Sequence, residues 1–145
     1  MRRGSTASYV VVAAAAAIAS AFVGANLGRS QAQPAPAPAP AKQLLAQPLP
    51  DLPGREVRVT LLDRAPGAGS PPHRHPGHHT FGYVIEGTYE FAINGEPPRL
   101  LKAGEVFYEP PGALHSTSRN PSSDKPAKIL VFMVADQKNP STVAP

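Results

Sequence analysis

The sequence predicts an all-β fold from about residue 51 onward, with short strands that close into a sandwich or a double-sheet barrel. From that point no stretch shows a helical period of apolar residues, and prolines and glycines interrupt the chain, which has 19 and 12 of them in all. Short apolar runs bounded by turn residues take the place of helices. Closing such strands into two facing sheets removes most of their exposed edges.

Residues 1–32 have the composition of a secretory signal. Arg2 and Arg3 precede an uncharged stretch whose apolar centre covers 9–23, and small residues follow at 30–32. An N-terminal membrane anchor is the alternative, because 10–27 is marginally long enough to span a bilayer. Either interpretation predicts an exported protein that is periplasmic or otherwise extracytoplasmic, held at the inner membrane if the segment is an anchor.

Residues 33–53 have the composition of a Pro/Ala-rich linker. The segment 34–41 repeats Pro-Ala and predicts an extended spacer, and 42–53 remains rich in proline. A tether with little structure therefore fits this stretch better than a strand or a helix does. We expect the barrel itself to cover 54–138 and residues 139–145 to form a flexible tail.

Six stretches within the barrel region have the pattern of strands. Apolar and polar residues alternate in the first of them, and the second and third are rich in aromatic and β-branched residues. Gly87 joins the second to the third, and Asn94-Gly95 marks a tight turn after the third. The six predicted strands are 56–63, 80–86, 88–93, 106–109, 114–118 and 128–135.

Charge and composition exclude several classes of function. The formal net charge is +4, but three of the fourteen basic residues lie within 1–32, which holds no acidic residue; eleven basic and ten acidic residues remain. No later stretch forms a basic stripe, so nucleic acid is not an expected partner. Cysteine is absent, which excludes disulfides, thiolate metal sites and cysteine nucleophiles. Any metal must be bound by nitrogen or oxygen.

Histidines carry the chemical information in this sequence. All five lie in the strand-rich region, and His73 and His75 are two residues apart, so on a strand both side chains leave the same face. Neutral imidazole is a good ligand for Fe, Zn, Cu, Ni or Mn. A solvated histidine-rich loop is the alternative interpretation of this cluster.

The spacing around the histidines resembles the two motifs of the cupin superfamily. Gly67, His73, His75 and Gly87 follow the first motif, G-x5-HxH-x3,4-E-x6-G. The second motif, G-x5-PxG-x2-H-x3-N, is matched by Gly104, Pro110, Gly112 and His115, with Asn120 one position late. The resemblance implies a small single-domain cupin, a double-stranded β-helix or jelly-roll barrel, with one divalent metal ion bound by His73, His75 and His115.

The fourth ligand of the family, a glutamate, falls on Thr80, and a threonine hydroxyl is a poor metal ligand. His78 shares strand parity with Thr80 and His79 sits at the shorter permitted spacing, so either can complete a four-histidine site. Parity favours His78. Glu109 and Arg119 are close enough in sequence to reach the cavity mouth, but surface charges are the simpler expectation for both.

Some non-haem iron dioxygenases of the cupin superfamily bind their metal through three histidines. The resemblance therefore implies Fe as the expected metal, with Zn, Mn, Ni or Cu as alternatives. The expected function is dioxygenase-like chemistry on a small organic substrate. A non-catalytic module that binds a small ligand or a metal is the main alternative, and a metal-free structural barrel is another.

Strand alternation also predicts a pocket and a partner. If Thr80 faces the metal, Gly82 and Val84 lie on the same side and line the substrate pocket. Phe81, Tyr83 and Ile85 then face outward and need a cover, which predicts a homodimer.

Overall fold

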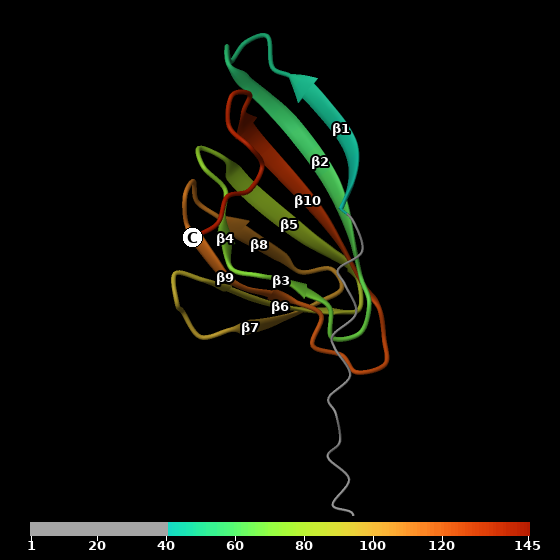
Figure 1. Ribbon diagram of the computed structural model, residues 1–145. Helices are drawn as coiled ribbons and strands as arrows, with labels where there is room; N and C mark the ends of the chain where they lie inside the picture. Colours follow the sequence, from blue (N-terminus) through green and yellow to red (C-terminus); the bar gives the residue numbers. More distant parts are fainter. Residues whose placement is uncertain (1–40) are drawn as a thin grey trace, which may run out of the picture. The chain divides into compact units, whose positions relative to one another are not determined.

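The structure is a computed structural model that describes residues 41–145, and these residues form two facing antiparallel β-sheets (Figure 1). The predicted all-β double-stranded β-helix is confirmed. The secretory signal or anchor at 1–32 and the first part of the linker lie outside the described residues and stay predictions. Within the described part of the chain, no helix is long and apolar enough to cross a membrane. The strands are β1 Lys42–Pro48, β2 Arg55–Arg64, β3 Gly69–Ser70, β4 His73–Arg74, β5 His79–Glu86, β6 Thr88–Ile93, β7 Arg99–Lys102, β8 Val106–Glu109, β9 Leu114–Arg119 and β10 Ala127–Asp136.

One sheet has the strand order β1-β2-β10-β5-β8 and the other β3-β9-β6-β7, with β4 also paired to β9. The long strands β2 and β10 pair over their full length, from Arg64 opposite Ala127 to Arg55 opposite Asp136. Gly87 turns β5 of the first sheet into β6 of the second at a φ of 77°, which a residue with a Cβ rarely adopts.

The apolar core lies between the two sheets. On β5 and β10 alternate residues are buried, which is the pattern that a strand with one face on a core must have. Stacked aromatic rings of Tyr89, Phe91 and Phe107 fill one part of this core, with ring centroids 4.5 and 5.5 Å from the Phe107 ring. The remaining core residues are Val84, Leu101, Ala127, Ile129, Val131, Met133 and Ala135.

Part of the predicted linker is a strand. Strand β1 runs antiparallel to β2, with Lys42 opposite Leu61 and Pro48 opposite Glu56. Its side chains are exposed throughout, so no alternation of apolar residues marked it in the sequence. Main-chain hydrogen bonds hold it in place, and the only proline within the strand is at its end, where the ladder loses little. The expectation of a structureless tether over 42–48 was therefore wrong.

The predicted flexible tail is also ordered against the barrel. Val143 and Arg74 exchange two main-chain hydrogen bonds of 3.0 Å, so the last residues run beside β4, which carries His73. In Figure 1 the C-terminus lies beside β4 and β9. The tail thus belongs to the wall of the site described next.

Candidate metal centre

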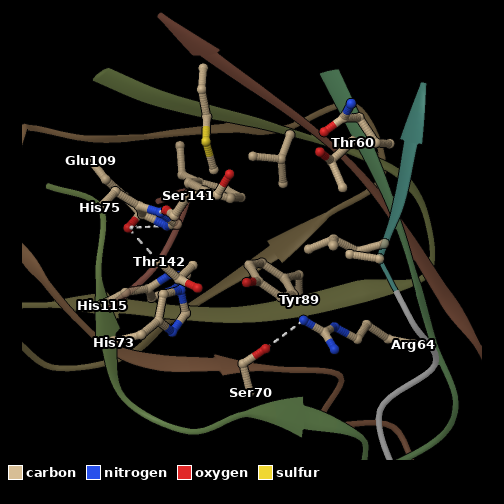
Figure 2. Close-up of a pocket in the computed structure, with 16 residues that line it drawn as sticks. Thr60, Arg64, Ser70, His73, His75, Tyr89, Glu109, His115, Ser141 and Thr142 are labelled. Carbon is tan, nitrogen blue, oxygen red and sulfur yellow. Dashed lines mark hydrogen bonds and ion pairs between the residues drawn. The ribbon is translucent and has the colours of Figure 1, made fainter. Parts of the chain in front are cut away.

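Three imidazoles meet at one end of the space between the sheets. His73 on β4 is the direct cross-strand partner of His115 on β9, and His75 follows β4 by one residue. The ring centroids of His75 and His115 each lie 4.9 Å from that of His73. One ring nitrogen from each residue lies within 4.8 Å of the others, so the three can bind a single ion. The structure thus brings together the three residues that the motifs predicted (Figure 2).

Main-chain carbonyls orient two of these rings. The Nδ1 atom of His73 donates to the carbonyl of Pro71 at 2.8 Å, and Nδ1 of His75 donates to the carbonyl of Ser141 at 2.5 Å. A carbonyl only accepts, so the proton must be on Nδ1 and the lone pair on Nε2. Metal-binding histidines are commonly fixed in this way, because the second hydrogen bond sets the tautomer and the direction of the ring.

Burial keeps the imidazoles of His75 and His115 neutral. Desolvation is the main reason that the pKa of His75 falls to about 4 and that of His115 to about 3. A neutral imidazole is the form that binds a metal. Neither ring nitrogen of His115 has a hydrogen-bond partner within the described residues, although the side chain is only 3% exposed. Buried polar atoms without a partner are costly, and a bound ion would satisfy one of the two nitrogens.

A buried carboxylate adjoins the three histidines. Glu109 at the end of β8 is 2% exposed, and its Oε2 atom lies 3.3 Å from Nδ1 of His115 and 3.7 Å from Nε2 of His75. Desolvation raises its pKa to about 8. The expectation that Glu109 is a surface charge was wrong. Glu109 has the same strand parity as the core residue Phe107, and this alternation in the sequence predicts an inward side chain. Arg119, in contrast, is exposed and pairs with Glu90, as expected.

The donor set fits a divalent first-row ion. It contains three imidazole nitrogens and one carboxylate, and no sulfur. Two ligand atoms that bind one ion at about 2.1 Å lie about 3.0–3.5 Å apart, depending on the geometry. The distance from Glu109 to His115 falls in this range and that to His75 slightly above it. The residues present therefore suit the metal that the cupin motifs imply.

A cavity of about 460 Å³ opens onto the three histidines. Its walls are mixed, with an apolar part from the core and a polar part that includes Arg64 at the end of β2 (Figure 2). A volume of this size accommodates a small organic molecule. The lining residues are Ala41, Gln43, Thr60, Leu62, Arg64, Ser70, His73, His75, Tyr89, Phe107, Glu109, His115, Val131, Met133, Ser141 and Thr142.

The C-terminal segment forms one wall of this cavity. Ser141 and Thr142 line it, and the Ser141 carbonyl holds His75 as described. His78 anchors the same segment from below: its Nδ1 accepts from the main-chain nitrogen of Asp136 at 3.0 Å, and its Nε2 donates to the carbonyl of Pro140 at 2.8 Å. We call residues 139–143 the C-terminal strap.

Neither predicted candidate for a fourth histidine ligand joins the group. His78 is fully buried, but both its ring nitrogens are used to hold the strap and the end of β10. His79 points to the outer surface, where its Nδ1 atom contacts the Tyr108 hydroxyl at 2.8 Å. His78 is buried like Thr80, as their shared parity predicts, but the turn at 76–77 separates it from β4 and it does not join the other three histidines.

The predicted pocket residues are buried but do not line this cavity. Val84 belongs to the apolar core, and Thr80 lies opposite Glu109. On the inner side of Gly82 no space is left for a ligand, because the Phe107 ring lies within 2.0 Å of the position that a Cβ would take. Alternation predicted the buried face of β5 correctly. The substrate-pocket assignment was wrong because the Phe107 ring fills that side.

Comparisons with known proteins agree with this geometry. A family model described as "Cupin domain" matches residues 60–133. Germin-like protein subfamily 2 member 2 of Arabidopsis thaliana is 36% identical over 86 residues, which cover 57% of this chain and 38% of that protein. Germin-like protein 8-2 of Oryza sativa subsp. japonica is 31% identical over 102 residues, 66% of this chain and 46% of that protein. This chain spans less than half the length of these curated relatives.

Solved structures share the fold. An oxalate oxidase in complex with the substrate analogue glycolate has a TM-score of 0.58 at 26% identity, over 77% of this chain and 56% of that one. The DMSP lyase DddQ from Ruegeria pomeroyi DSS-3 has a TM-score of 0.53 at 27% identity, over 61% and 42%. A Cupin 2 conserved barrel domain protein from Salinispora arenicola has a TM-score of 0.51 at 27% identity, over 64% and 72%.

Proposed function

On the premise that this chain belongs to the cupin family, we propose that it binds one divalent metal ion and acts with it on a small organic molecule. One observation carries the proposal. Three imidazoles, two of them buried, converge at the end of a cavity, and the two whose tautomer is fixed leave Nε2 free. His73, His75 and His115 would bind the ion.

Glu109 supplies the fourth protein ligand in this proposal. Its carboxylate is buried, lacks a hydrogen-bond partner at Oε2, and lies beside two of the three imidazoles. Burial without a partner favours the neutral acid, as the raised pKa shows. A divalent cation at the histidines reverses this preference, because it attracts the charged form. Metal binding is therefore expected to release a proton from Glu109.

The bound ion would supply Lewis-acid and redox chemistry that this chain's side chains lack. Fe is the first ion to test, with Mn, Ni, Zn or Cu as alternatives, because imidazole and carboxylate ligands suit all of them. Relatives of similar fold support a catalytic function, since one is named an oxalate oxidase and another a DMSP lyase. Fold alone does not fix the reaction, so dioxygenase-like chemistry is our proposal for this chain.

The protein's own contribution is to position the substrate and to limit access of water. Apolar walls from Leu62, Val131 and Met133 face the cavity, and the C-terminal strap lies over the histidine end. A site of this kind strengthens electrostatic interactions, because water is largely excluded from it.

The proposal also includes location: we propose that the protein is exported, as residues 1–32 predict. Cell fractionation with a reporter fused after residue 145 tests this.

Oxygen uptake tests the proposed activity. Protein without a His-tag is loaded separately with Fe²⁺ and Zn²⁺, and oxygen consumption is followed with a panel of phenols, diketones and small carboxylic acids. We expect uptake with at least one compound for the Fe²⁺ form, and none for His115→Ala. A stoichiometric metal without turnover of any compound contradicts the enzyme and favours the non-catalytic binding module.

A further inference from the structure

A buried arginine faces the same cavity as the three histidines. Arg64 is the last residue of β2 and is only 5% exposed. In Figure 2 its guanidinium enters the cavity from the β2 side, whereas the imidazoles enter from the side of β4 and β9. Its main chain is fixed by the pairing with Ala127 on β10 and by the side-chain amide of Asn120, which donates to the Arg64 carbonyl at 3.2 Å.

The charge of Arg64 is not compensated by the described part of the chain. Its Nη2 atom donates to the Ser70 hydroxyl at 2.6 Å, and its Nε atom has no hydrogen-bond partner. Among residues 41–145, no carboxylate forms an ion pair with it; the ion pairs found there involve other cations. A guanidinium has five N–H donors, and burying its charge without a counter-ion is costly.

We propose that the ligand of this cavity carries a carboxylate group, which Arg64 and Ser70 bind. The inference rests on the proposed function, in which the end of the ligand opposite the carboxylate would lie toward the three histidines. It gives that function a substrate class, a small organic acid with an apolar or partly polar body.

Carboxylate fits this place better than other anions do. The guanidinium fork matches the two oxygens of a carboxylate, with which it forms two parallel hydrogen bonds. One carboxylate also neutralises one guanidinium. A dianionic phosphate would be costly to desolvate in a cavity lined by Leu62, Val131 and Met133. A neutral ligand would leave the charge of Arg64 uncompensated.

Paired probes test the proposal without knowledge of the true substrate. The probes are acetate, butyrate, benzoate and 3-phenylpropionate, each compared with its primary amide, which has nearly the same shape and no charge. Binding is measured by calorimetry on protein with its metal and again after chelation. We expect at least one acid to bind about tenfold or more tightly than its amide, because a charge-assisted bidentate contact is stronger than a neutral one. Equal binding of every pair, or no binding of any acid, contradicts the proposal.

Variants locate the preference at Arg64. Arg64→Gln should remove the acid-over-amide preference while metal content stays unchanged, and Arg64→Lys should keep part of it, because lysine retains the charge without the fork. Arg99→Gln is the matched control: this arginine lies over the Phe91 ring outside the cavity, so its loss should leave the preference intact. The wild-type comparison of acids with amides stands even if Arg64→Gln fails to fold.

The outcomes separate this proposal from the metal site. If the preference survives Arg64→Gln but disappears on chelation, the carboxylate binds the metal and the inference about Arg64 is wrong. If wild-type protein holds no metal and the preference still depends on Arg64, the proposed metal function fails and this inference stands.

Discussion

Thr80 and Glu109 lie directly opposite each other on the neighbouring antiparallel strands β5 and β8, and both side chains are buried. The cupin motif has its glutamate at the position of Thr80. This chain has a threonine there and a carboxylate across the strand pair, beside two of the three histidines. The carboxylate that this chain lacks at the motif position is thus present at the same site, contributed by a different strand.

The first prediction concerns this exchange. Glu109→Gln should weaken metal binding by about tenfold or more, since the amide is a poorer ligand and carries no charge to offset that of the ion. The double variant Thr80→Glu, Glu109→Thr returns the carboxylate to the strand of the motif and should recover most of the affinity. Competition with a chelator of known affinity measures both. Unchanged affinity in Glu109→Gln would mean that this carboxylate is not a ligand.

The C-terminal strap gives a second prediction. Deleting residues 139–145 removes the carbonyl that orients His75, and losses of such supporting contacts typically weaken metal binding by about 10–100-fold. Ser141→Ala is the control, because it removes the hydroxyl and keeps the carbonyl. We expect a weaker metal complex in the truncated protein and wild-type affinity in Ser141→Ala, with circular dichroism to verify the fold. Equal affinity in all three proteins would show that the strap does not support the site.

Stability of the metal-free protein should depend on pH in two opposite ways. In the folded chain the pKa values of His75 and His115 are about 4 and about 3. Below pH 6.5 these two residues are therefore protonated in the unfolded chain before they are protonated in the folded chain, and the free energy of unfolding decreases as the pH falls. Above pH 6.5 stability falls again up to about pH 8, because the folded chain retains a proton on Glu109 that the unfolded chain has lost. Urea unfolding of chelated protein should show a maximum near pH 6.5.

Glu109→Gln is the control for the alkaline side of that profile. Glutamine cannot titrate, so the loss of stability between pH 6.5 and pH 8 should disappear while the acid side remains. An alkaline loss of the same size in wild type and variant would show that another group is responsible.

The outer face of β5 and β8 is the surface through which we expect the predicted homodimer to form. Phe81, Tyr83 and Tyr108 are 42–45% exposed, and the rings of Phe81 and Tyr108 lie 5.0 Å apart, so they form one apolar surface. Light scattering should give twice the monomer mass for wild type and the monomer mass for Tyr83→Arg. Leu100→Arg, on the exposed side of β7, should leave the dimer intact. A monomeric wild type would contradict the prediction.

Features of this fold were predictable where side-chain burial sets the pattern. The strand 88–93 was predicted with its observed bounds, and the alternation in β5 identified its buried face. Strand β1 and the C-terminal strap were missed because main-chain hydrogen bonds hold them and their side chains are largely exposed. A pattern of apolar residues carries no signal for such contacts.

The histidine group was predictable from the spacing of the motifs. The positions of Glu109 and Arg64 in the site depend instead on how the strands pair. Their inward direction is visible only as parity with neighbours, Glu109 with Phe107 and Arg64 with Leu62. What each would meet there is set by the pairing of β5 with β8 and of β2 with β10, which lie far apart along the chain. Local sequence does not encode these registers.

Metal content is the most direct test of the central claim. After gel filtration, elemental mass spectrometry measures the metal content of four tag-free proteins: wild type, His73→Ala, His115→Ala and His79→Ala. The last is the control, because the His79 ring points outward. The account predicts about one divalent ion per chain in wild type and His79→Ala, and loss of the ion in the other two, because removing one ligand of a buried site leaves it incomplete. Stoichiometric metal in both His73→Ala and His115→Ala would contradict it.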